Sequence, residues 1–180
     1  MSEYRRAQVK GGCYFFTVIT KDRSPFLVRE DVRLALRTSI QEVHVRFPFT
    51  VEGWVLLPDH LHCLWTLPAD DHDFSKRWSL IKRYTSQQLA GMPGWEPKKS
   101  EGNRREAGLW QRRFWEHLIR DEADFRNHMD YMHWNPVKHG LVTNAAAWPY
   151  STFHRLVAQG VYPGLWGGDC VRDDGAAFGE

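Results

Sequence analysis

Two short apolar segments on either side of Pro58-Asp59 constrain the fold of this chain more than any other feature. Residues 49–57 and 60–67 are each too short for a helix of average length and are rich in apolar side chains, so each is typical of a strand. Pro58-Asp59 provides the turn between them. The sequence therefore predicts a β-hairpin in the middle of a sheet.

The segments around this hairpin alternate between strand-like and helix-like patterns. In chain order they predict a strand at 13–20, a helix from Asp31 to about Val45, the hairpin, a helix from Asp73 or Ser75 to about Ala90, a strand at 114–119, and a helix that Asp121 caps and Pro136 and Gly140 end. This order is that of the ferredoxin-like split β-α-β sandwich, an α+β fold with an antiparallel sheet and helices on one face. We expect residues 91–108 to form a flexible loop and the residues after the last helix to be irregular.

The composition is that of one folded domain. The 180 residues include 9 Trp, 6 Tyr and 10 Phe, and 42% of them are hydrophobic, which excludes disordered, collagen-like and low-complexity chains. No apolar run approaches the roughly 20 residues that span a bilayer, and no segment of signal-peptide type follows Met1. The cysteines, Cys13, Cys63 and Cys170, are odd in number and far apart, which argues against a disulfide framework or a zinc knuckle and fits a reducing cytoplasm.

Charge is distributed unevenly along the chain, although the formal net charge is only +2. Residues 76–113 hold ten basic and three acidic residues, a net charge of +7, whereas the last sixteen residues carry −3. Such a basic segment indicates a polyanionic partner on one face, with a solvated charged loop as the alternative.

Two histidines in the second strand of the hairpin form the first candidate site. Because residues i and i+2 of a strand point to the same face, His60 and His62 would stand side by side and could share one divalent cation. Leu61 and Cys63 would anchor the opposite face in the core. The alternative is that the two imidazoles face solvent and bind nothing.

A stripe on the last predicted helix forms the second candidate site. His128, Tyr131 and Asn135 are spaced three and four residues apart, so they share one face. The neighbouring stripe is apolar and would pack on the sheet through Phe125, Met129 and Met132. Tyr131 would then lie at the edge of the core, with the Asn135 oxygen one turn further as a possible ligand. A packing tyrosine and a helix-end asparagine are the alternatives.

A third group combines basic and aromatic side chains. Lys82-Arg83-Tyr84 lies on the second predicted helix, and residues 110–115 lead into the fourth strand with two arginines among aromatic rings. Arginine pairs with phosphate and aromatic rings stack on unpaired bases, so the pattern favours single-stranded nucleic acid. A solvated helix face beside ordinary core tryptophans is the alternative.

Taken together, these segments resemble the REP-associated tyrosine transposases, bacterial relatives of the single-tyrosine HUH (His-hydrophobic-His, IS200-like) transposases that act on single-stranded DNA. The matching stretches are 1–6, 54–65, 110–117, 130–142 and 148–154, and they are spread over nearly the whole chain in family order. The resemblance implies the same ferredoxin-like fold. It also implies one domain over residues 1–165, with a basic N-terminal arm, and an irregular acidic tail over residues 166–180.

The resemblance also implies roles for individual residues. His60 and His62 match the family's metal-binding pair, Tyr131 matches the nucleophile and Asn135 matches a third metal-ligand position, with Mg²⁺ or Mn²⁺ as the implied cofactor. Attack by Tyr131 on a phosphodiester would leave a 5′-phosphotyrosine and a free 3′-hydroxyl, so the implied enzyme is a metal-dependent DNA nickase and ligase of transposition. His128 is a candidate base for Tyr131 by spacing alone.

The implied partners are single-stranded DNA and REP hairpins. The candidate DNA contacts are Arg5, Arg6, Lys82, Arg83, Arg112 and Arg113. We expect a cytoplasmic, nucleoid-associated monomer with no membrane partner, and a dimer stays open. Two other functions also stay open: a REP-hairpin binding protein without catalysis, and a metal-dependent hydrolase in which water attacks the phosphate in place of Tyr131.

Overall fold

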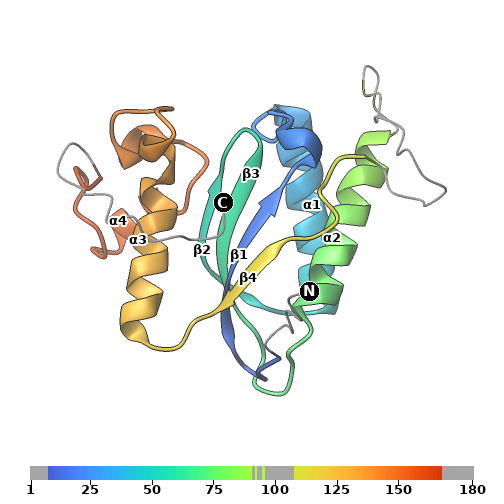
Figure 1. Cartoon of the computed structure of the whole chain (residues 1–180), viewed down its shortest axis with the longest axis horizontal. Coiled ribbons are helices and arrows are strands. Elements are labelled where there is room, and N and C mark those ends of the chain that lie inside the picture. The colour runs from blue at the N-terminus through green and yellow to red at the C-terminus, as the bar shows by residue number, and fades with distance from the viewer. Residues whose placement is uncertain (1–7, 91, 93–94, 96–107, 168–180) are drawn as a thin grey trace, which may run out of the picture.

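The computed structural model describes residues 8–90, 92, 95 and 108–167. Its strands and α-helices, in chain order, are β1 (Cys13–Ile19), α1 (Glu30–Arg46), β2 (Thr50–Leu56), β3 (His60–Thr66), α2 (Phe74–Ala90), β4 (Trp115–Leu118), α3 (Glu122–Lys138) and α4 (Phe153–Ala158), shown in Figure 1. Two short 3₁₀ turns, η1 (Lys21–Arg23) and η2 (Ala145–Ala147), complete the list. The four strands begin and end within one residue of the predicted bounds.

The strands form one antiparallel sheet in the order β2-β3-β1-β4. The hairpin around Pro58-Asp59 supplies β2 and β3, and β1 inserts between β3 and β4. This is the strand order of the split β-α-β sandwich, so the predicted α+β fold class is confirmed. In the described residues, no helix is both long and apolar enough to cross a membrane.

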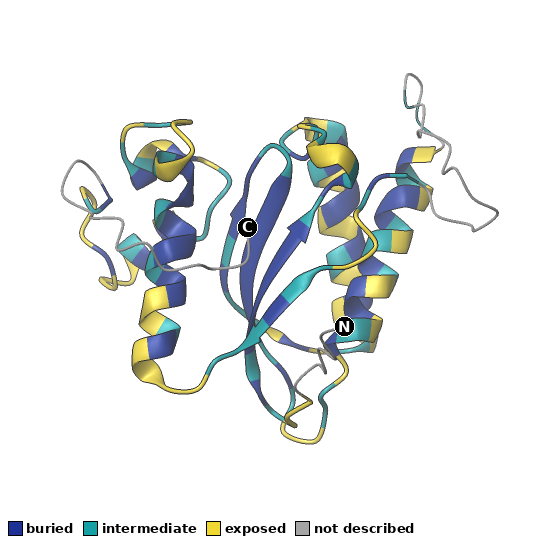
Figure 2. Cartoon of the chain, in the orientation of Figure 1, coloured by how far each residue is buried: buried dark blue, intermediate teal, exposed yellow. Residues whose placement is uncertain are grey.

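The helices cover both faces of the sheet, which corrects the prediction that they lie on one face. Helices α1 and α2 pack on one face, whereas α3 and α4 pack on the other (Figure 1). The cause is visible in β3, where Leu61, Cys63 and Trp65 face α1 and α2, while Leu64 belongs to the core beneath α3. A strand buried on both faces needs cover on both, and Figure 2 shows the central strands in the buried colour.

The ends of the helices follow the sequence signals only in part. Asp121 caps α3 as predicted, because its carboxylate accepts a hydrogen bond from the Asp124 backbone N–H at 2.8 Å. Asp31 does not cap α1: Arg29 occupies that position, and Asp31 pairs with it instead. Pro136 does not end α3 either. It is buried, so packing offsets the hydrogen bond that its nitrogen cannot make, and the helix continues to Lys138.

The chain after α3 is more regular than predicted. Helix α4 begins at Phe153, and both Phe153 and Leu156 are buried in the same apolar cluster as Met129 and Met132 of α3. This short helix therefore extends the cover of the second face. The predicted loop at 91–108 lies almost entirely outside the described residues.

Gly53 of β2 allows α3 to approach the sheet closely. A Cβ atom at this position would collide with the end of the Met132 side chain and would lie 2.7 Å from the Met129 sulfur. Both methionines belong to the stripe that was predicted to face the sheet, and Met132 is completely buried. The absence of a side chain at Gly53 thus sets the distance between α3 and β2.

Replacing Gly53 by Val should push α3 outward and lower the free energy of unfolding by about 1–3 kcal/mol, because an overpacked core forces side chains off their rotamers. Urea unfolding measures the loss. Gly164→Ala is the matched control, since its Cβ would meet nothing nearer than Val157 at 4.0 Å. Equal stability of the two variants would contradict this account of the interface.

Candidate active site

His60 and His62 lie side by side on the buried face of β3 beneath α3. Their ring centroids are 4.9 Å apart and the ring planes cross at 80°. His60 is 2% exposed and His62 is fully buried, so the alternative that both face solvent is wrong. Because the planes intersect, nitrogen lone pairs from the two rings can point toward one position.

A second partner holds each imidazole in place. Nδ1 of His60 donates to the Asp59 carboxylate at 2.7 Å, and Nδ1 of His62 lies 2.9 Å from the Thr17 hydroxyl, which the β1–β3 register places directly opposite. Burial opposes ionisation of Asp59, but His60 and Arg23 together lower the pKa of this carboxyl below its usual value. Such Nδ1 partners are typical of metal-binding histidines, where they fix the ring and direct Nε2 toward the ion.

Tyr131 lies against this histidine pair from the opposing helix. Its ring centroid is 5.4 Å from that of His62 and 6.3 Å from that of Phe15 on β1, and its side chain is 8% exposed. Asn135 is one turn further along α3 and completely buried. The fold thus brings His60, His62 and Tyr131 together and places Asn135 on the same helix face, as the spacing predicted.

Two further residues of the site were missed at the sequence level. The His139 ring lies 5.2 Å from that of His60, and Lys138 Nζ lies 5.0 Å from the centre of the Tyr131 ring. The signal was present as helical spacing, because Lys138 follows Tyr131 by two turns and His139 follows Asn135 by one. Both positions lie between Pro136 and Gly140, the two predicted end signals, and the helix continues past the first of them.

The donor set at this site fits a labile divalent cation. Two imidazole nitrogens and the amide oxygen of Asn135 are ligands that Mn²⁺ and Mg²⁺ accept beside water, and three protein ligands leave coordination positions open. The crossed ring planes and the Nδ1 partners agree with this use of His60 and His62.

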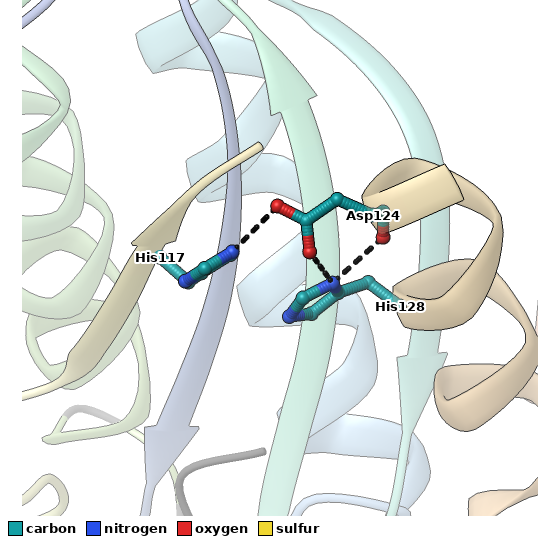
Figure 3. Close-up of side chains that lie close together, drawn as sticks. All are labelled: His117, Asp124 and His128. Carbon is teal, nitrogen blue, oxygen red and sulfur yellow. Dashed lines mark hydrogen bonds and ion pairs between the residues drawn. The ribbon is translucent and has the colours of Figure 1, made fainter. Parts of the chain in front are cut away.

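A second group of titratable residues joins β4 to the start of α3 (Figure 3). His117 Nε2 lies 2.9 Å from one Asp124 carboxylate oxygen, and His128 Nδ1 lies 3.1 Å from the other and donates to the Asp124 backbone carbonyl at 2.8 Å. Their ligand atoms all lie within 4.8 Å of one another, as a metal site requires. However, the two rings are stacked 4.5 Å apart at 16°, so their lone pairs run in nearly parallel planes and do not converge.

This group is better suited to anchoring α3 than to binding a metal. Asp124 is 8% exposed and also accepts hydrogen bonds from the backbone and side chain of Arg120, at 3.0 and 3.1 Å. Burial opposes ionisation of Asp124, but the hydrogen bonds from His117 and Arg120 hold its pKa well below the usual value. Burial also lowers the pKa of His128, whose ring packs 4.9 Å from Phe15.

The predicted DNA-contacting residues lie apart from the histidines and Tyr131. Lys82 and Arg83 are on α2, across the sheet from α3, and Lys82 Nζ donates to the Gln111 carbonyl at 3.0 Å. This hydrogen bond brings α2 next to Arg112 and Arg113, which are exposed. Arg5 and Arg6 lie outside the described residues.

Comparison with known proteins places the chain in a family. A family model described as "Transposase IS200 like" matches residues 8–133. The chain is 46% identical to a REP-associated tyrosine transposase of Escherichia coli strain K12, over 94% of this chain and 93% of that protein. It is 42% identical to a putative REP-associated tyrosine transposase of Haemophilus influenzae, over 94% and 95% of the two chains.

A solved structure supports the same assignment. A REP-associated tyrosine transposase bound to a REP hairpin superposes with a TM-score of 0.81 at 44% identity, covering 100% of this chain and 98% of that one. The chain therefore belongs to the IS200-like transposases and, within them, to the REP-associated tyrosine transposases.

Replacing Asp124 by Asn should destabilise the protein by about 1–3 kcal/mol at neutral pH, because the buried donors lose a charged acceptor. The lowered pKa makes this contribution largest above the unfolded value of about 3.9, and it is lost as the pH falls through the folded value. The difference between wild type and Asp124→Asn should therefore shrink in acid. Urea unfolding between neutral pH and about pH 3 measures it, and a constant difference would contradict the anchoring role of the carboxylate.

Proposed function

We propose that this protein is a metal-dependent tyrosine transposase that cleaves and rejoins single strands of DNA at REP hairpins. The observation that carries the proposal is the contact between Tyr131 and His62, which brings a tyrosine on α3 against a buried histidine pair on β3. The relatives named for REP elements, and the similar structure of a transposase bound to a REP hairpin, support the substrate.

In this proposal Tyr131 is the nucleophile. Its hydroxyl oxygen attacks the scissile phosphorus, the bond from phosphorus to the 3′-oxygen breaks, and the strand leaves with a 3′-hydroxyl after that oxygen takes up a proton. The phenol proton passes to solvent or to a nearby base. The 5′-phosphate stays on Tyr131, so the energy of the phosphodiester is conserved and a 3′-hydroxyl can reverse the reaction without ATP.

The residues around Tyr131 prepare this attack. The ring packs against His62 and Phe15, which restricts its orientation before the DNA arrives. His60, His62 and Asn135 would hold Mg²⁺ or Mn²⁺, and the bound cation would neutralise charge on the phosphate and on the transition state. Tyrosine is a weak nucleophile at neutral pH, since its ordinary pKa is about 10, which is why such help is needed.

Binding of the hairpin would depend on the basic residues outside this centre. Arg112 and Arg113 are exposed, whereas part of the hydrogen-bonding capacity of Lys82 is used within the protein. The proposal places the protein in the cytoplasm on nucleoid DNA, acting as a monomer in which β3 and α3 of one chain supply the whole centre. The proposed domain covers residues 1–165, and Arg5 and Arg6 are proposed contacts to the single-stranded element.

Replacing Tyr131 by Phe should abolish cleavage and the covalent adduct while hairpin affinity stays within a few-fold, because only the nucleophilic oxygen is lost. The measurement is denaturing electrophoresis after incubation with a labelled REP hairpin and Mn²⁺. Tyr162→Phe is the matched control. The Tyr162 hydroxyl donates to Asp130, and its ring packs against His133 rather than against His60 or His62.

The same assay separates the remaining functions. A hydrolase would cleave without a trapped adduct and would survive Tyr131→Phe, and a binding protein would shift the hairpin without cutting it. His62→Ala and chelation by EDTA should each prevent cleavage by wild-type protein, because both remove the cation from the phosphate. Cleavage that survives EDTA would exclude the metal-dependent mechanism.

Replacing Arg112 and Arg113 by Ala should weaken binding to cognate and to scrambled DNA by similar factors. It should also make the affinity less dependent on salt. Each lost phosphate contact should reduce the slope of log K against log salt by about 0.7–0.9. Fluorescence anisotropy over a salt series measures the slope, with Arg37→Ala, an exposed arginine on α1, as the control. An unchanged slope would show that the two arginines do not contact phosphate.

A further inference from the structure

Lys138 is the last residue of α3, and its side chain returns over the face of Tyr131. Nζ lies 5.0 Å from the centre of the Tyr131 ring, within the range of a cation–π contact. The residue is exposed, whereas Tyr131 is 8% exposed and packs on its inner side against His62. A cation therefore lies on the accessible side of the proposed nucleophile.

Positive charge beside the phosphate favours the proposed reaction. The phosphate arrives as an anion, and its charge spreads over the non-bridging oxygens as the bond to Tyr131 forms. His60, His62 and Asn135 would hold a cation that binds one of these oxygens. A second non-bridging oxygen is then left for Lys138, which carries three donors on a flexible stem beside the Tyr131 ring.

We infer that the ammonium group of Lys138 binds the scissile phosphate at Tyr131 and is a further catalytic residue of strand cleavage. This inference rests on the proposed function and adds a second cationic contact to the same phosphate. Lys138 gives and accepts no proton: the bond from phosphorus to Tyr131 forms and the bond to the 3′-oxygen breaks as described above.

A structural role is the competing explanation. A lysine in the last turn of a helix interacts favourably with the helix dipole, and its contact with Tyr131 would then serve only to hold the ring. Both effects act on the free protein. They would change stability without coupling Lys138 to any one phosphate of the DNA.

The first measurement is the single-turnover rate of cleavage of a REP hairpin. Lys138→Met keeps the length of the stem without its charge and should slow cleavage roughly 100-fold, the usual effect of removing one contact to the developing charge. Lys138→Arg should stay within about tenfold of wild type, since it restores the charge with a different shape. Arg126→Met removes an exposed cation of the same helix that pairs with Glu122, and should cleave at the wild-type rate.

The second measurement does not depend on cleavage. In the Tyr131→Phe background, hairpins that carry one neutral methylphosphonate at each linkage in turn are tested for affinity. Neutralising the scissile linkage should weaken binding about threefold or more further when Lys138 is present than when it is Met, as a coupled pair requires. Thermal unfolding of each variant measures any change in stability.

Each outcome has a distinct meaning. Slow cleavage by Lys138→Met together with coupling to one linkage supports the inference. Wild-type cleavage by Lys138→Met, or equal effects of every methylphosphonate in both backgrounds, overturns it. If wild-type protein forms no adduct, the proposed function fails, and the linkage scan still decides whether Lys138 contacts a phosphate.

Discussion

Burial of the central strands on both faces is the constraint on which the candidate site depends. In β1 and β3 nearly every side chain is buried, so helices must cover each face of the sheet. Helix α3 meets that need on the second face and carries Tyr131 and Asn135 with it. The same packing that removes apolar surface from water, at roughly 1.5–3 kcal/mol for each buried side chain, also brings the tyrosine to His62.

Local patterns were sufficient to predict the strands, the strand order and the proximity of His60, His62 and Tyr131, although not Lys138 and His139 beside them. His60 and His62 share a face because side chains alternate along a strand, and Tyr131 and Asn135 share a face because of the helical repeat. What the patterns could not give was the face of the sheet that α3 covers. A strand buried on both sides shows no alternation of apolar and polar residues, so its pattern does not reveal that a helix covers the second face. The only signal for that face in β3 was the pair of histidines, His60 and His62.

Of the two predicted end signals of α3, Gly140 was correct, since it follows the C-cap at a φ of 66°, and Pro136 was wrong. Pro136 is an ordinary signal for the end of a helix, and here tertiary packing overrides it, since Pro136 and Asn135 are both buried. The extra residues bring Lys138 and His139 within reach of Tyr131 and His60. The rule that proline ends a helix therefore fails where α3 contributes residues to the candidate site. Functional sites are where sequence rules of this kind are expected to fail.

Helix α3 is held at two places that are separate from Tyr131 and Asn135. Asp124 fixes its first turn to His117 of β4, and Met132 fixes its middle against Gly53 of β2. Because a helix is stiff, these two contacts determine the position of Tyr131 along and above β3. Asp124 and Gly53 can thus be changed without altering His60, His62 or Tyr131 themselves, and the placement of Tyr131 depends on side chains outside the histidine pair.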